Sequence, residues 1–100
     1  MVIDVLAHVP HCYTYADGER IAALIVDAIR RGDDAVVSFR GVSAVPSSFV
    51  NAAFVSLLDE FSVDTVRGRL RVVDSTKQIN SLIKDQVQRE AASRREAVYA

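Results

Sequence analysis

Apolar and polar residues alternate over the first nine positions of the chain. The apolar positions of this pattern are Ile3, Val5, Ala7 and Val9. A period of two is typical of a β-strand with one buried face, because successive side chains of a strand point to opposite sides. We therefore expect a strand over residues 2–9 that ends at Pro10, since proline cannot donate a hydrogen bond to a neighbouring strand.

Apolar residues at every third or fourth position predict a helix from Gly18 or Glu19 to Arg31. Asp17 is expected to cap its first turn, because a carboxylate accepts hydrogen bonds from the free backbone N–H groups there. Gly32 follows the last turn, where the left-handed conformation that glycine tolerates commonly ends a helix. The buried stripe of this helix is expected to contain Ile21, Leu24, Ile25, Ala28 and Ile29.

Two short apolar runs predict further strands: residues 34–39 a central strand, and residues 70–73 a third core strand. Between them, helical spacing predicts a second helix from about Ser48 to Glu60 or Phe61. Its expected buried stripe is Val50, Ala53, Phe54, Leu57, Leu58 and Phe61.

A last helix is expected after Ser75 or Thr76, either of which can cap it. Its apolar positions are Ile79, Leu82, Ile83 and Val87. Beyond Arg89 the pattern weakens, so residues 89–100 either continue the helix or form a frayed tail. Residues 63–68 predict a turn or a short helical piece.

Strands and helices therefore alternate along the chain. This order predicts an α/β fold: a single small domain over residues 1–100 with a mostly parallel sheet of three to five strands packed against three helices. Ligands and switches in such sheets lie at the carboxyl ends of the strands. The loop from Arg40 to Ser47 is the most informative segment at that edge.

Composition and charge narrow the class of protein. Half of the residues are hydrophobic, a quarter are charged, and the net charge of −1 argues against a general nucleic-acid binder. The charge is uneven: residues 1–66 carry a net −5 and residues 67–100 a net +4. Two alternatives follow, which are self-association into a homodimer and weak nucleic-acid binding through Arg67, Arg69, Arg71 and the last helix.

The location of the protein is expected to be cytoplasmic. The longest apolar run is far shorter than the ~20 residues that span a membrane, and the first residues carry no basic segment typical of a signal peptide. The single cysteine, Cys12, cannot form an intramolecular disulfide.

The strongest resemblance to a known family lies in the middle of the chain. Residues 38–50 read SFRGVSAVPSSFV and are followed by Asn51, with DGERI before them and RLRVVDSTKQINSLI after them. This pattern resembles a bacterial STAS-like domain family of unknown function, which is similar to the STAS domain of bacterial anti-sigma factor antagonists. In those antagonists a partner that is both a histidine-kinase-like ATPase and the anti-sigma factor phosphorylates a serine at a helix start.

That resemblance implies a regulatory switch with Ser47 or Ser48 as the phosphoacceptor. The chain departs from the antagonists at two positions, since Pro46 stands in place of an aspartate and Phe49 in place of a glycine. From the residues themselves, Ser47 is expected to cap the second helix. Phe49 is expected to be an exposed interface anchor. The residues expected to contact a protein partner are Arg40, Val42, Ser43, Pro46, Phe49 and Asn51.

The sequence gives little support for a metal site or a catalytic site. His8, His11 and Cys12 suggest a metal site, but no second cluster supplies the remaining ligands. A Cys12 thiolate paired with either histidine lacks an orienting group. Because no base, nucleophile and orienting group line up, we expect a non-enzymatic binding module without a cofactor or a metal.

Overall fold

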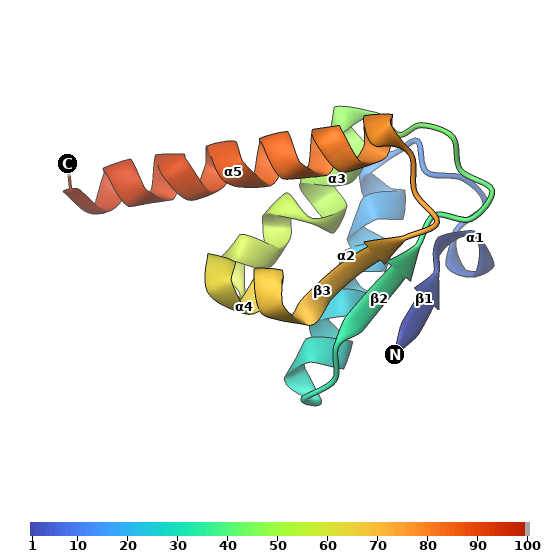
Figure 1. Ribbon diagram of the computed structural model, residues 1–100, viewed down its shortest axis with the longest axis horizontal. Coiled ribbons are helices and arrows are strands. Elements are labelled where there is room, and N and C mark those ends of the chain that lie inside the picture. The colour runs from blue at the N-terminus through green and yellow to red at the C-terminus, as the bar shows by residue number, and fades with distance from the viewer. Residues whose placement is uncertain (100) are drawn as a thin grey trace.

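The computed structural model describes the backbone of residues 1–99 and the side chains of residues 1–94 (Figure 1). Three parallel strands form one sheet in the order β1-β2-β3 within this part of the chain. The elements are β1 (Val2–Asp4), α1 (Val5–His8), α2 (Tyr15–Arg30), β2 (Ala35–Ser38), α3 (Ser47–Ala53), the 3₁₀ helix η1 (Val55–Asp59), α4 (Val63–Arg69), β3 (Leu70–Val73) and α5 (Lys77–Tyr99). The expected α/β fold with a parallel sheet is confirmed. The expected count of three helices is wrong, because the structure contains five α-helices and one 3₁₀ helix between residues 1 and 99.

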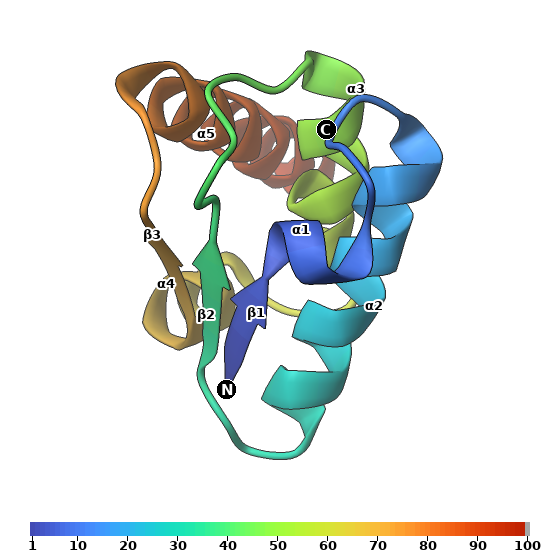
Figure 2. The same ribbon diagram turned by 90° about the vertical axis from the view of Figure 1, so that its right-hand side faces the viewer.

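One face of the sheet builds the core. Ile3 pairs in register with Val37, and Val37 pairs with Val72. Ile3 and Val37 are fully buried, whereas Val72 on β3 is only half-buried. Figure 2 shows α1, α2 and α3 on the same side of the strands. The expectation that residues 70–73 form a core strand is therefore wrong in part: the strand is present with those bounds, but it is half exposed.

A cluster of phenylalanines fills the centre of the core. Phe39, Phe49 and Phe54 are fully buried, and Phe39 contacts the other two rings with centroid distances of 6.3 and 6.1 Å. Helix α2 approaches α3 closely at Gly18, where an added Cβ would lie 2.6 Å from the carbonyl oxygen of Phe49. Glycine is therefore required at position 18 by the distance between the two helices.

The first strand is shorter than the alternating pattern predicts. Its pairing with β2 stops at Asp4 and Ser38, and the chain then forms one helical turn, α1, in which the N–H of Val9 donates to the carbonyl of Val5. Val5 and Val9 are buried and Ala7 is exposed. Two apolar residues four positions apart fit one face of a helix as well as one face of a strand. Beyond Asp4 the chain has no strand to pair with, so the helical turn supplies a hydrogen bond to the backbone there.

Helix α2 begins at Tyr15, three or four residues before the expected start. Thr14 caps it and forms a capping box with Asp17, since each side chain accepts a hydrogen bond from the other's backbone N–H. Asp17 therefore occupies the third helical position, and its assignment as the cap is wrong. The glycine at the other end is confirmed: Gly32 has φ +85°, with hydrogen bonds of a Schellman motif from Gly32 to Ile29 and from Asp33 to Ala28.

The expected second helix is broken into α3 and η1 at Phe54. The hydroxyl of Ser56 donates to the carbonyl oxygen of Ala52 at 2.6 Å. A side chain thus binds a carbonyl that a backbone N–H would bind in a continuous helix. The apolar stripe expected for this segment is nevertheless buried, apart from the half-buried Phe61. Residues 63–69 form α4, which Ser62 caps.

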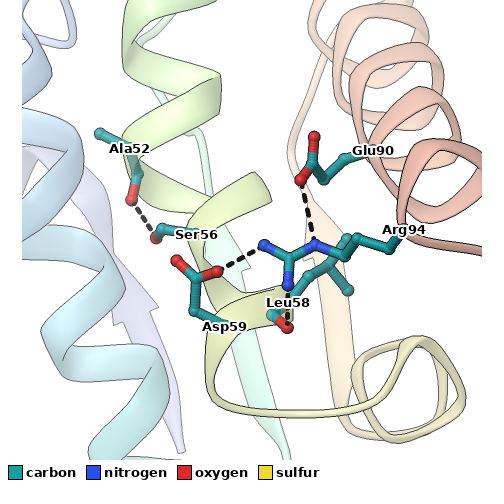
Figure 3. A network of polar contacts seen from close by, with 6 residues as sticks. All are labelled: Ala52, Ser56, Leu58, Asp59, Glu90 and Arg94. Atoms are coloured by element: carbon teal, nitrogen blue, oxygen red, sulfur yellow. Dashed lines mark hydrogen bonds and ion pairs between the residues drawn. The ribbon is translucent and has the colours of Figure 1, made fainter. Parts of the chain in front are cut away.

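The last helix continues through the weakly patterned segment as far as Tyr99. Of the two alternatives for this segment, the backbone therefore shows a continued helix and not a frayed tail. Figure 3 shows how Arg94 attaches α5 to η1: its guanidinium donates to the carbonyl oxygen of Leu58 at 3.1 Å and to Glu90 at 3.0 Å, and pairs with Asp59. The hydrogen bond with Asp59 is the main reason that the pKa of Arg94 is raised. Polar contacts therefore hold this part of α5, where its apolar stripe is sparse.

Candidate functional site

The two candidate serines lie where the chain enters α3. Ser47 is the first residue of the helix, and both Ser47 and Ser48 are exposed. The N-cap is Pro46, with an extended backbone (φ −80°, ψ 163°) and no side-chain cap. The expectation that Ser47 caps the helix is therefore wrong. Proline already has a φ suited to the helix entry, so the helix begins one residue earlier than a serine cap would place it.

A tight turn leads from β2 to this helix start. Gly41 has φ +85°, a conformation that glycine tolerates, and the N–H of Val42 donates to the carbonyl of Phe39 at 2.9 Å. The buried hydroxyl of Ser38 donates to Asp74 at 2.8 Å, which ties the end of β2 to the residue after β3. The turn therefore starts from a fixed position at the carboxyl edge of the sheet.

Helix α5 holds the next part of the loop through two side chains. The Gln78 amide bonds both backbone groups of Val45, accepting from its N–H at 3.2 Å and donating to its carbonyl at 3.1 Å. Thr76 donates to the carbonyl of Ser43 at 3.0 Å and also accepts from the N–H of Ile79 at 3.3 Å, which makes it the cap of α5. The role of Gln78 could not be predicted from the sequence, because nothing in a glutamine on the polar side of a helix indicates a distant loop.

The remaining expected contact residues differ in their exposure. Arg40, Ser43, Pro46 and Asn51 are exposed, and Val42 is half-buried. Phe49 is 0% exposed and packs edge-on against Phe39, so its assignment as an exposed anchor is wrong. The Phe49 ring lies in the core beside Phe39, where an apolar side chain belongs.

A second segment lies against the same loop. Residues 10–13 and 41–44, together with Leu6, line a shallow pocket of about 180 Å³. His11 pairs with Asp17 at 3.0 Å and stacks on Tyr13 with a centroid distance of 4.8 Å. Burial tends to raise the pKa of Asp17, but the hydrogen bonds from Thr14 and the charge of His11 outweigh it and hold that pKa below its ordinary value.

The environment of Cys12 argues against both a metal site and a reactive thiolate at this position. Cys12 is buried, and burial, followed by the charge of Asp17, raises the pKa of its thiol to about 11. A thiol with so high a pKa stays protonated at neutral pH and is a poor nucleophile and ligand. Within the described residues, no three histidine, cysteine or acidic side chains lie close enough together to hold a metal ion.

Comparison with known proteins gives the family. A family model described as a STAS-like domain of unknown function matches residues 17–80, and the chain belongs to that family. This range extends from the first turn of α2 to the first turn of α5, and it includes the loop and both serines. Searches of curated proteins and of solved structures found no match. In the part of the chain that the structure describes, none of the helices is both long and apolar enough to cross a membrane.

Proposed function

We propose that this STAS-like domain is a non-enzymatic regulatory module that binds a protein partner through residues 42–51. The observation that carries the proposal is the exposure of Ser47 and Ser48 at the start of α3, beside a loop that α5 holds in one conformation. Because Pro46 occupies the N-cap, modification of the Ser47 hydroxyl removes no helix cap. A rigid, exposed segment loses little conformational freedom on binding, which favours docking of a partner.

The partner that the resemblance suggests is a histidine-kinase-like ATPase that phosphorylates Ser47 or Ser48. A phosphoryl group adds roughly −1.5 to −2 charges at neutral pH. At an exposed position this charge either prevents or promotes binding of the protein partner, without a direct effect on the core. The serines thus supply a switch, and the neighbouring exposed residues Arg40, Ser43 and Asn51 supply contacts.

Mass spectrometry of the protein from its own cells tests the switch. We expect a single added phosphoryl group that maps to Ser47 or Ser48. The added mass should disappear in the corresponding alanine variant and persist in Ser81→Ala, which removes an exposed serine from α5. Phosphorylation at another residue, or its absence under every growth condition, contradicts the switch.

Site-specific crosslinking tests the docking surface separately. A photoreactive residue at Asn51 should capture a defined protein, whereas the same residue at Asn80, an exposed asparagine on α5, should not. Equal capture at both positions contradicts docking at residues 42–51. An ATPase identified in the captured band supports the kinase-like partner.

The ion pairs favour this proposal over charge-driven self-association. Arg69 lies 3.5 Å from Asp34, and Arg94 pairs with Asp59. Both pairs join the basic last third to the acidic first part within one chain. Two of the eight basic residues in residues 67–100 are thus already paired with acidic residues of the first part inside the monomer.

A further inference from the structure

An apolar groove lies on another part of the molecule, between α4, β3 and α5. Its volume is about 300 Å³, and it shares no residue with the loop over residues 42–51. Figure 1 shows α5 passing over the end of β3 while α4 lies at its beginning. The larger apolar residues along the groove are Val63, Val66, Leu70, Val72, Ile83 and Val87.

The groove lies along β3, the last strand of the sheet. Leu70 and Val72 are half-buried, whereas the residues paired with them on β2, Ala35 and Val37, are fully buried. These two side chains point toward the core side of the sheet, but no further strand extends the sheet beyond them within residues 1–99. The molecule therefore leaves apolar surface uncovered at one edge, which is typical of a binding groove.

The charges at the groove indicate what covers it. Arg67 from α4 and Lys84 from α5 line it from its two helical walls, and no carboxylate lines it. Neither of these cations forms an ion pair with another residue of the described side chains, whereas Arg69 and Arg89 do. An occupant that brings its own carboxylates to both walls gains two ion pairs at the rim of an apolar contact.

This chemistry separates the classes of occupant. A second copy related by a two-fold axis would bring the same groove, with the same cations, against itself, and like charges would oppose each other. A single-stranded nucleic acid gains affinity by stacking bases on aromatic side chains, and none lines the groove. We propose that the groove binds a short acidic amphipathic segment of a partner protein, with apolar side chains on the floor and aspartate or glutamate beside Arg67 and Lys84.

A designed peptide tests this directly on the full chain. The probe is a fluorescein-labelled peptide with leucine at every third or fourth position and glutamate elsewhere, and its control carries lysine in place of glutamate. Fluorescence polarisation should show saturable binding of the glutamate peptide that weakens at high salt. The double variant Arg67→Glu, Lys84→Glu should bind about tenfold more weakly or worse, while Arg20→Glu, a charge reversal at an exposed site on α2, should bind as the parent does.

Nuclear magnetic resonance then locates the peptide. Shifts confined to the amides and methyls of Val66, Val72 and Val87 support the proposal. Shifts at residues 42–51, binding unchanged by the double variant, or equal binding of the lysine peptide overturn it. Displacement of the glutamate peptide by a labelled single-stranded oligonucleotide also overturns it. Because the groove and the loop share no residue, failure here leaves the proposed docking of residues 42–51 standing.

Discussion

The loop at residues 42–46 and the groove between α4, β3 and α5 are both built on helix α5, but by different forces. At the start of α5, Gln78 and Thr76 hold the loop by hydrogen bonds to backbone groups of Val45 and Ser43. Further along, Ile83 and Val87 form an apolar wall of the groove. Directional bonds fix a conformation, whereas apolar contact fills space without fixing its partner. One helix thus supports a rigid polar surface and a more adaptable apolar one.

The largest effect is expected where the loop rests on the core. Phe49→Ala removes a fully buried ring that contacts Phe39, and should lower the free energy of unfolding by about 3–5 kcal/mol. Asn51→Ala, two residues further along α3 and exposed, should change it by less than about 0.5 kcal/mol. Denaturant unfolding of both variants measures the difference. Similar losses would show that α3 does not bury Phe49.

The same substitution should have opposite signs at two glycines. An added Cβ at Gly18 lies 2.6 Å from the Phe49 carbonyl oxygen and 2.7 Å from the Cβ of Ala52, so Gly18→Ala should cost roughly 1–3 kcal/mol of stability. Gly68 in α4 has nothing within 4 Å of an added Cβ, so Gly68→Ala should gain about 0.5–1 kcal/mol from helix propensity. Thermal unfolding measures both. A loss at Gly68 would contradict the open space described beside α4.

Removal of the Gln78 amide should loosen the loop and leave the groove intact. Gln78→Ala leaves two backbone groups of the buried Val45 without partners, at a cost of about 1–3 kcal/mol. Hydrogen exchange of the Val45 amide should accelerate, while binding of the glutamate peptide stays unchanged. The Arg67→Glu, Lys84→Glu variant should instead weaken binding of the glutamate peptide and leave hydrogen exchange of the Val45 amide unchanged. A change in both readouts for either variant would show that the two surfaces are coupled through α5.

The smallest effect concerns acid pH and the segment beside the loop. The pKa of Asp17 is lower in the folded protein than its ordinary value, so folding favours the carboxylate. Its contribution to stability is therefore complete above the ordinary pKa and is lost as the pH falls through the lowered one. The melting temperature of Asp17→Asn should lie below that of the parent at neutral pH and converge with it in acid. A constant difference at all pH values would show that the charge of Asp17 contributes nothing.

Local signals in the sequence were sufficient to predict much of this fold. The stripe of α2 from Ile21 to Ile29, the runs that form β2 and β3, and the positive φ of Gly32 and Gly41 all follow from short-range spacing and backbone sterics. The exposed serines at the start of α3 could also be placed, because a proline after an apolar strand indicates a helix entry.

Other features depended on contacts between distant segments. Residues 5–9 are compatible with both a strand and a helical turn, and the end of the β2 pairing selects the turn. Phe49 has the same local sequence whether it faces solvent or the core, and only the packing of α3 against the end of β2, where its ring meets Phe39, shows that it is buried. Gln78 and the groove could not be predicted for the same reason: Gln78 contacts Val45 at a separation of 33 positions, and the groove joins residues of three different elements, with no signal in any one segment alone.

The sequence by itself determined the family, the positions of the three strands along the chain, and the location of the serines at a helix start, because these depend on interactions within a few residues. The tertiary structure alone decided that Phe49 is buried, what holds the loop, and where apolar surface stays uncovered. These depend on which elements meet in space, and the free energy of such contacts is gained only when the whole chain has packed.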